Sequence, residues 1–314
     1  MNKINAPFFA VWYMTRRCNL ACKHCFIEVM PTNTKPKELS TDEGKELIDR
    51  LADADVYQLA FAGGEPLVRP DLLELARYAR DAGMTVQLAT NGLGIVPERV
   101  KELLGAGFRC VQISLDGATP STHDRLRGSG HFETTIASIR HATEGGLPVV
   151  LAIAVHRGNL HEVDLMIKLA QTEKAIILKL QPVWTQFNLG GNSSALELAE
   201  IQALVPKVET LATSAGIKLS LPRYTQIVAE AGAERTCLSD LRVATISSTG
   251  RLGICDFAPE LASGDVLRDA FLPLWKRVVQ NHQRNQRCGC TPFLERLDET
   301  DSSNSIQLSA GARL

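Results

Sequence analysis

The chain has 314 residues, 45% of them hydrophobic, and its 34 Lys and Arg residues almost balance 35 Asp and Glu residues, for a formal net charge of −1. This length predicts roughly two domains, and the apolar fraction is large enough for a real core. This near-equality of positive and negative charge argues against a protein that binds nucleic acid electrostatically, because such proteins are usually basic. The longest apolar run, residues 147–155, is shorter than a membrane span of about 18 residues, so we expect neither a nucleic-acid nor a membrane partner.

The first five residues lead straight into strand-like sequence and lack the pattern of a secretion signal. We therefore expect a cytoplasmic protein, because thiol-rich sites persist and disulfides are rare in that reducing compartment. The eight cysteines are interpreted as metal ligands or free thiols. Cys110, at the start of a predicted strand, is expected to be a buried core residue, as free cysteine often is.

Three cysteines spaced C-x-x-x-C-x-x-C follow the first predicted strand, residues 7–14. Cys18, Cys22 and Cys25 lie in one loop, and three thiolates in one loop can hold a soft centre such as an iron–sulfur cluster. A four-iron cube held at three corners leaves its fourth iron open for a ligand. A structural zinc site and chance clustering are the alternatives, although zinc sites usually pair C-x-x-C with a distant second pair.

Strands and amphipathic helices then alternate as far as about residue 215. Residues 40–43 form a capping box at the start of a helix. Further strands are predicted at residues 56–61, 84–89, 109–115, 148–155 and 175–180. Further helices are predicted at residues 71–82, 97–104, 160–170 and 195–215, and another contains Phe132, Ile136 and Ile139. Gly105 follows directly after the predicted helix 97–104, as is common at helix ends. Six strand–helix units predict an α/β fold with a parallel sheet, a partial (β/α)6 TIM barrel that is open because a full barrel has eight units.

Polar or glycine-rich residues come directly after these strands: the cysteine loop, residues 63–66, Asn91, Asp116 and Gln181. All of them fall at the carboxyl ends of parallel strands. That edge carries the active site in barrels and in open α/β sheets. The position of these residues therefore predicts a functional site without reference to any family.

After residue 215 the pattern changes. Residues 242–247 and 251–254 are predicted to form a hairpin around a turn at 248–250. A helix is expected at residues 271–279, and the tail from residue 298 is polar and expected to be loose. The sequence therefore predicts a barrel over residues 1–215, a small cysteine-rich domain over 216–297, and a tail over 298–314.

The cysteine loop resembles the signature of the radical S-adenosylmethionine (SAM) family, C-x-x-x-C-x-aromatic-C, with His24 at the aromatic position, and residues 63–66 resemble its GGEP motif. The resemblance implies a 4Fe–4S cluster on Cys18, Cys22 and Cys25, whose open iron binds the methionine part of SAM. In that family the cluster cleaves SAM reductively to a 5′-deoxyadenosyl radical, while the protein orients the reactants and excludes side reactions.

The resemblance also implies a set of residues around the cofactor. Gly63, Gly64 and Glu65 would face the methionine ammonium, because glycines let the backbone approach a ligand closely. Further candidates for the nucleoside, the methionine carboxylate or the substrate are Asn91, Ser114, Asp116, Arg127 and Asn159. Four of these, Asn91, Asp116, Arg127 and Asn159, have an ordinary structural alternative: a turn residue, a surface salt bridge or a helix cap. The histidines show no recognisable ligand pattern.

The distal cysteines resemble the start of the SPASM/twitch extension of this family, with Cys237 and Cys255 flanking the predicted hairpin. Cys288 and Cys290 would complete four ligands for one auxiliary iron–sulfur cluster, and no cysteine follows them. Their C-x-C spacing departs from the common C-x-x-C, which leaves open whether both bind iron or one thiol is free for hydrogen-atom transfer. A zinc site and structural thiols are the alternatives.

The family includes pyrroloquinoline quinone and mycofactocin maturases and haem-pathway decarboxylases. The resemblance thus implies an enzyme that abstracts hydrogen from a peptide or from a cofactor or small-molecule precursor, with a flavodoxin-type reductase as electron donor. Because the chain begins almost at its first strand, we expect a small molecule, or a peptide presented by a separate recognition protein. The alternatives are an aminoglycoside-type or carbohydrate dehydrogenase or epimerase, and a non-catalytic zinc or iron–sulfur binding module.

Overall fold

The computed structural model describes residues 6–25, 27, 29–35, 37–183, 194–221, 242–254 and 264–284. In this part of the chain, nine strands form one sheet in the order β11-β10-β1-β4-β5-β6-β7-β8-β9. These strands are β1 (Phe9–Thr15), β4 (Gln58–Gly63), β5 (Thr85–Thr90), β6 (Phe108–Ser114), β7 (Val149–Val155), β8 (Ile177–Pro182), β9 (Lys218–Ser220), β10 (Val243–Ile246) and β11 (Leu252–Gly253). All neighbours pair in parallel except β10 and β11, which form an antiparallel hairpin.

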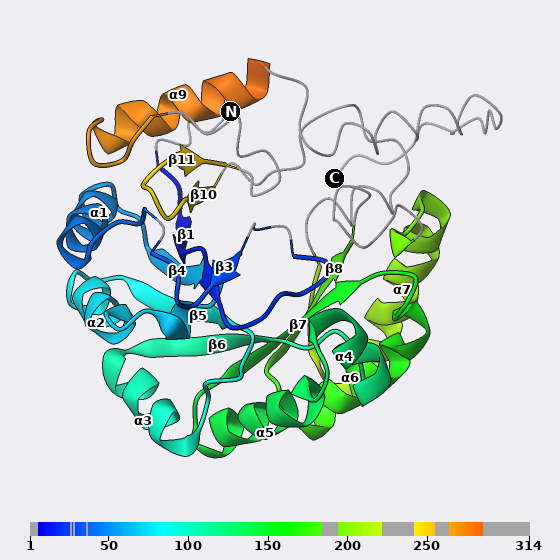
Figure 1. The fold of residues 1–314 in the computed structure, drawn as a ribbon. Coiled ribbons are helices and arrows are strands. Elements are labelled where there is room, and N and C mark those ends of the chain that lie inside the picture. The colour runs from blue at the N-terminus through cyan, green and yellow to red at the C-terminus, as the bar shows by residue number, and fades with distance from the viewer. Residues whose placement is uncertain are drawn as a thin grey trace, which may run out of the picture.

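Helices cover the outer face of this sheet, as Figure 1 shows by the arc from α1 to α7. They are α1 (Thr41–Asp53), α2 (Leu72–Asp81), α3 (Pro97–Ala106), α4 (Pro120–Arg127), α5 (His131–Glu144), α6 (Val163–Thr172), α7 (Leu198–Ala215) and α9 (Phe271–Arg284), with short 3-10 helices η1 (Pro66–Val68) and η2 (Leu160–Glu162). The six strands from β1 to β8 and their helices confirm the predicted partial barrel. None of the helices in the described ranges is long and apolar enough to cross a membrane.

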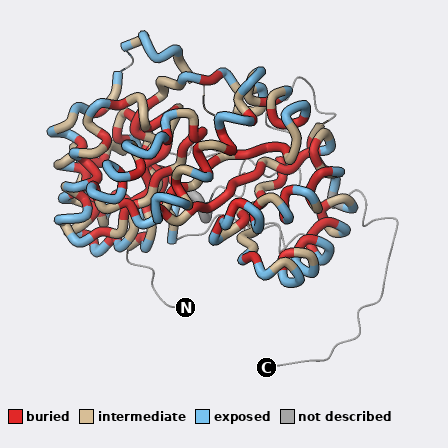
Figure 2. Tube along the Cα trace, turned by 90° about the horizontal axis from the view of Figure 1, so that it is seen from below, coloured by how far each residue is buried: buried red, intermediate tan, exposed pale blue. Residues whose placement is uncertain are grey.

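The core lies between the sheet and its helices, where one face of each strand packs against apolar helix faces. Figure 2 shows this as a buried centre with exposed outer surfaces. In β8, for example, Leu178 and Leu180 are fully buried, whereas Lys179 and Gln181 alternate with them and are half-buried. Because strand side chains alternate between faces, the second set lines the inside of the barrel. The inner face is therefore available for a polar site.

The predicted start of α1 is confirmed in detail. Ser40 Oγ accepts a hydrogen bond from the Glu43 amide at 3.2 Å, and the Glu43 carboxylate accepts one from the Ser40 amide at 2.8 Å. This reciprocal capping satisfies two of the donors that a helix start leaves unpaired. Leu47, Ile48 and Leu51 on the inner face of α1 are fully buried, as the helical spacing predicts.

Two predictions about local structure are wrong, and one helix was missed. The α3 helix does not end before Gly105 but continues to Ala106, and Gly107 ends it in the left-handed conformation at φ 95°. The α4 helix was not predicted, because its sequence is largely polar and only Thr122, His123 and Leu126 are buried. Cys110 is half-buried rather than part of the core.

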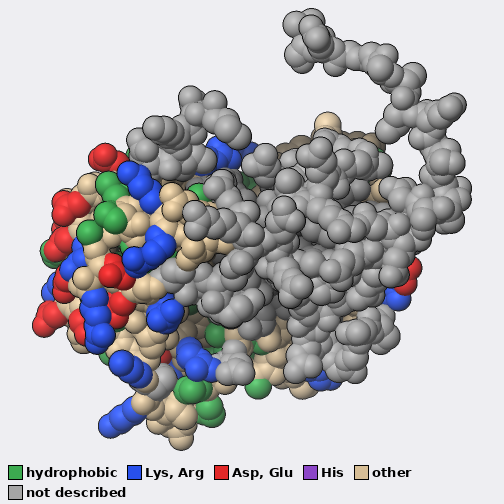
Figure 3. All heavy atoms as spheres, turned by 90° about the horizontal axis from the view of Figure 1, so that it is seen from above, with side chains coloured by type: hydrophobic (Ala, Val, Ile, Leu, Met, Phe, Trp, Pro, Cys, Tyr) green, Lys and Arg blue, Asp and Glu red, His purple; other side chains and the backbone are tan. Residues whose placement is uncertain are grey.

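The predicted hairpin is present, but it joins the barrel. Strand β10 pairs with β1 in parallel, from Phe9 opposite Val243 to Trp12 opposite Ile246. The predicted domain boundary after residue 215 therefore falls within this sheet, which β9 extends at the other edge. Cys237, Cys255, Cys288 and Cys290 lie outside the described residues, and so does the tail from residue 298. On the face seen in Figure 3, described side chains of both charges occur together, in line with the net charge of −1.

Candidate active site

The cysteine loop leaves the carboxyl end of β1 and is closed at its base by a short parallel pair of strands. Strands β2 (Arg17–Cys18) and β3 (Met30–Pro31) place Arg17 opposite Met30. The Met30 amide also donates to the Arg16 carbonyl at 2.7 Å. Halfway round, the Lys23 amide donates to the Leu126 carbonyl at the end of α4, at 3.0 Å. The loop is therefore anchored both at its base and against α4.

The three loop cysteines are free and half-buried. Burial raises the pKa of Cys18 to about 11, and it also raises the pKa of Cys22 and Cys25, although the nearby Arg127 guanidinium opposes that shift. The Leu20 amide approaches Cys18 Sγ at 3.4 Å, an arrangement that favours a thiolate. Such thiols bind a metal centre as thiolates, and their protons are released to the solvent.

The two glycines of the GGEP motif lie against the backbone that begins the cysteine loop. The Gly64 amide donates to the Thr15 carbonyl at 2.7 Å, and the Glu65 amide donates to the Arg17 carbonyl at 2.8 Å. A Cβ added to Gly63 would overlap the Thr15 carbonyl oxygen, and one added to Gly64 would overlap the Arg17 carbonyl oxygen. Both positions need glycine because two backbone segments meet there. Both glycines also line the cavity described below, so the expected approach of a ligand to them stays a prediction.

We therefore expect Gly64→Ala to destabilise the protein by about 1–3 kcal/mol, since its methyl group must displace backbone rather than a flexible side chain. The loop that carries Cys18 should shift with Arg17, and iron binding should weaken. Gly105→Ala is the matched control, because nothing lies within 4 Å of a Cβ added there and α3 continues through that residue. That control should gain about 0.5–1 kcal/mol. Urea unfolding midpoints and iron content measure both effects, and equal behaviour of the two variants would contradict the steric argument.

Glu65 and Asn91 join the ends of β4 and β5 to the cysteine loop. The Glu65 carboxylate is buried and accepts hydrogen bonds from Thr90 Oγ1 at 2.8 Å, the Asn91 amide at 2.8 Å and the Leu67 amide at 3.0 Å. Burial raises the pKa of Glu65, while these donors stabilise its charged form. Asn91 Nδ2 donates to Asn19 Oδ1 at 2.7 Å and lies 4.0 Å from Cys18 Sγ. The Glu65 carboxylate thus supports the loop instead of facing a ligand as expected.

Asp116 connects several elements on the opposite side of the site. Its fully buried carboxylate accepts hydrogen bonds from Arg127 Nε and from the Ala154 amide, and it lies 3.1 Å from His24 Nε2. Burial alone would raise the pKa of Asp116, but the charges of Arg127 and His24 outweigh it and hold the pKa well below its usual range. Asp116 therefore links β6, α4, β7 and the cysteine loop, and both of its oxygens have protein partners. This differs from the expected place beside the ribose or substrate.

Asn159 lies behind Asp116 and is also fully buried. Its Nδ2 donates to the carbonyls of Asp116 at 2.9 Å and Ala154 at 2.8 Å, and its Oδ1 accepts from the His156 amide at 2.8 Å. Asn159 therefore holds the ends of β6 and β7 together, and although it is the N-cap residue of η2, its side chain makes no capping bond there.

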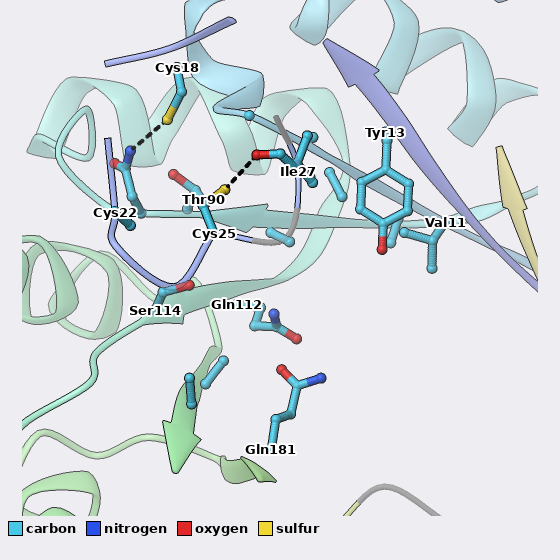
Figure 4. Close-up of a pocket in the computed structure, with 18 of the residues that line it drawn as sticks. Val11, Tyr13, Cys18, Cys22, Cys25, Ile27, Thr90, Gln112, Ser114 and Gln181 are labelled. Carbon is cyan, nitrogen blue, oxygen red and sulfur yellow. Dashed lines mark hydrogen bonds between the residues drawn. The ribbon is translucent and has the colours of Figure 1, made fainter. Parts of the chain in front are cut away.

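A cavity of about 370 Å³ opens between the cysteine loop and the inner face of the sheet. Eight of the predicted site residues line it: Cys18, Cys22, Cys25, Gly63, Gly64, Asn91, Ser114 and Arg127. Glu65, Asp116 and Asn159 are buried behind its wall. Figure 4 shows the three cysteines on one side of the cavity and the amides of Gln112 and Gln181 on another. The predicted residues are thus brought together, some as lining and some as support.

Sequence reasoning missed several residues of this site. His24 pairs with Asp116, and Asn19 pairs with Asn91, across large separations in sequence that no local pattern reveals. Lys179 and Gln112 also line the cavity. A signal for Lys179 was present, because a lysine between Leu178 and Leu180 in a buried strand must face the inside of the sheet.

The donor set fits an iron–sulfur cluster better than a zinc ion. A structural zinc site brings four Cys or His ligands to a single ion, with sulfur ligands about 2.3 Å away. The thiolates of a cluster each bind a different iron, so they need only surround a common space. Cys18, Cys22 and Cys25 line such a space, and the buried Arg127 beside them would offset negative charge.

Comparison with known proteins agrees with this site. Residues 12–170 match the model of the radical SAM superfamily. Over 298 residues the chain is 32% identical to an AdoMet-dependent heme synthase from Methanosarcina barkeri, covering 87% of this chain and 83% of that protein. Over 300 residues it is 32% identical to mycofactocin maturase MftC from Mycobacterium tuberculosis, covering 91% of this chain and 76% of MftC.

The fold agrees as well. SuiB from Streptococcus suis superimposes with a TM-score of 0.72 at 15% identity, over 86% of this chain and 66% of SuiB. SuiB has been solved with S-adenosylmethionine and with its precursor peptide SuiA. An identity this low shows a shared fold alone, while the family match and the relatives at 32% identity show common descent. This chain belongs to the radical SAM superfamily, whose enzymes use a 4Fe–4S cluster and S-adenosylmethionine.

Proposed function

We propose that this enzyme abstracts a hydrogen atom from the precursor of a cofactor or of a modified peptide. The observation that carries the proposal is the shared cavity: the cysteine loop and the polar inner face of the sheet enclose one space of about 370 Å³. A volume of this order suits a small organic group. When bound, the cluster and SAM would supply a 5′-deoxyadenosyl radical, and the barrel would supply the space beside it.

The chain's own residues have separable roles in this proposal. Cys18, Cys22 and Cys25 hold the cluster, and Asn91 and Ser114 face the cofactor from the ends of β5 and β6. Arg127 stays charged because Asp116 raises its pKa, although burial opposes this. A fixed positive charge beside Cys22 and Cys25 favours the thiolate forms of these ligands.

Two relatives support the choice of substrate class. The heme synthase and MftC both match more than four fifths of this chain, and their names place them in cofactor maturation. The family resemblance leaves a peptide and a small molecule both open, and a flavodoxin-type reductase is the proposed electron donor. A separate recognition protein would present the substrate if it is a peptide.

The test is an anaerobic assay of the reconstituted enzyme with a chemical reductant and SAM. We expect 5′-deoxyadenosine to form, and its yield to rise when either a porphyrin precursor of haem or a short precursor peptide is added. Mass spectrometry of the added compound identifies which one loses hydrogen. Formation of 5′-deoxyadenosine that neither class of precursor increases or consumes would contradict the proposed substrate class.

We also propose that Cys237, Cys255, Cys288 and Cys290 hold an auxiliary cluster in a twitch-like extension. The SPASM-type relatives support this, and so does the β10–β11 hairpin that separates Cys237 from Cys255 along the chain. Replacing Cys237 and Cys255 by alanine is expected to lower the iron content from about eight to about four per chain, if both clusters are 4Fe–4S. Iron analysis measures this, and an unchanged content would remove the auxiliary cluster from the proposal.

A further inference from the structure

Two glutamine side chains line the cavity from the inner face of the barrel. They are Gln112 on β6 and Gln181 near the carboxyl end of β8, and both are half-buried. Figure 4 shows their amide groups facing the same space below the cysteines. Ala152 and Ala154 of the intervening strand β7 also line the cavity, and their small side chains leave this space open. Two neutral amides from separate strands therefore meet one part of the lumen.

The amide of Gln112 is held in one orientation. Its Oε1 accepts a hydrogen bond from Lys179 Nζ at 3.2 Å, and an ammonium group has no acceptor to offer the amide nitrogen. The oxygen must therefore be the atom that faces Lys179, and this assignment does not depend on the other contacts of Lys179. Gln112 Nε2 has two hydrogen atoms and no hydrogen bond to the residues that the structure describes. Gln112 thus presents donors to the cavity.

The side chain of Gln181 has no hydrogen bond to any residue within the described part of the chain. Its amide offers a carbonyl acceptor and two N–H donors, and rotation about the last side-chain bond turns either group toward the cavity. A ligand that fills the cavity excludes water, and each polar group left unpaired then costs about 1–3 kcal/mol. A ligand that pairs both glutamines must therefore accept from Gln112 and donate to Gln181.

We infer that Gln112 and Gln181 bind an amide group of the substrate inside the barrel. Gln112 Nε2 donates to the carbonyl of that group, and Gln181 Oε1 accepts from its N–H. This rests on the proposed function, because it names the part of the substrate that the same cavity receives. A secondary amide is neutral and planar and carries its C=O and N–H on opposite sides, so it matches a donor on one strand and an acceptor on another. A carboxylate only accepts, so it leaves Gln181 Oε1 without a donor.

The experiment measures binding of small probes to the anaerobically reconstituted enzyme with SAM and without a reductant. Equilibrium dialysis compares N-methyl-3-phenylpropionamide with methyl 3-phenylpropionate, an ester of the same shape in which an oxygen replaces the N–H. Phe9 and Val11 in the lining provide an apolar surface for the phenyl ring. Wild type is expected to bind the amide about tenfold more tightly than the ester, because the ester leaves Gln181 Oε1 unpaired.

The two glutamines should respond differently to substitution. Gln181→Met should remove the preference for the amide. Gln112→Met should weaken both probes roughly fivefold and keep most of the preference, because Gln112 donates to the carbonyl that the probes share. Gln171→Met is the matched control, because Gln171 is exposed on α6. N-acetylphenylalanine N-methylamide distinguishes the two sources of such a group: tighter binding than that of the simple amide assigns a peptide, and weaker binding assigns a small molecule with a single amide.

Equal affinity of wild type for the amide and the ester would overturn the inference without any variant. A preference that Gln181→Met retains, or that Gln171→Met also loses, would overturn it as well. Tighter binding of 3-phenylpropionate than of the amide would replace the amide with a carboxylate, and displacement of the amide by SAM would assign the glutamines to the cofactor. The formation of 5′-deoxyadenosine by the same samples after reduction, without a probe, reports separately on the radical SAM function, so failure of the amide site and failure of the proposed function are distinguishable.

Discussion

Replacing Cys22 by alanine is expected to abolish the reductive cleavage of S-adenosylmethionine. Cys22 lies in the middle of the loop that carries the three cavity-lining thiols, and a cluster with only two protein ligands there loses both its anchor and its orientation. Iron bound by this loop should be lost, and the brown colour should weaken with it. Production of 5′-deoxyadenosine from the reduced protein measures activity, and iron analysis measures the cluster.

Cys110→Ala is the control for this prediction. Cys110, in β6, is also a free, half-buried thiol, but it does not line the cavity. Its replacement should leave both iron content and SAM cleavage close to those of wild type. If Cys22→Ala retained cleavage, or if Cys110→Ala lost it to the same degree, the assignment of the cluster to this loop would be wrong.

The second large effect is expected from Asp116→Asn, which should lower the free energy of unfolding by roughly 3–5 kcal/mol. The substitution leaves Arg127 and His24 without the carboxylate that both contact. Asp116 is fully buried and the Arg127 side chain is only 11% exposed, so water replaces that partner poorly. Urea unfolding at neutral pH measures the loss. Because the pKa of Asp116 lies below its usual value in the folded protein, the stabilisation is present above the unfolded pKa of about 4 and is lost as pH falls further.

A double variant separates the charge effect from general damage. Adding Arg127→Met to Asp116→Asn removes the uncompensated cation, so the double variant should be more stable than the sum of the two single losses predicts. Glu74→Gln serves as the surface control. Glu74 is exposed and its carboxylate lies 2.5 Å from Lys45 Nζ, and surface pairs of this kind contribute about 0–1 kcal/mol. Strict additivity, or a loss for Asp116→Asn no larger than for Glu74→Gln, would show that Asp116 does not act through its charge.

The Asp116→Asn variant also tests how the cysteine loop is positioned. His24 lies between two of the cluster ligands and meets Asp116, while the Lys23 amide binds the end of α4. With Asp116→Asn we expect the cluster to be retained but its EPR spectrum in the presence of SAM to broaden, because the loop gains freedom. A purely global destabilisation would leave the spectrum of the folded fraction unchanged.

The sequence by itself determined the chemistry and the order of the elements. The spacing of Cys18, Cys22 and Cys25 is local, so it can be recognised without a fold. The alternation of strands and helices is local as well, and it predicted the parallel sheet and the edge at which the site lies. The capping box of α1 was readable because a helix start depends on residues only three apart.

What tertiary structure alone decided is which side chains support the site and which line it. Glu65, Asp116 and Asn159 follow strands as active-site residues do, yet their polar atoms are taken up by neighbouring strand ends. The contacts of His24 and Lys179 are with partners far away in sequence, so their places in the site could not be predicted locally. The physical reason is that a hydrogen bond between strand ends depends on register and on the neighbouring strand, and neither is encoded within any one segment.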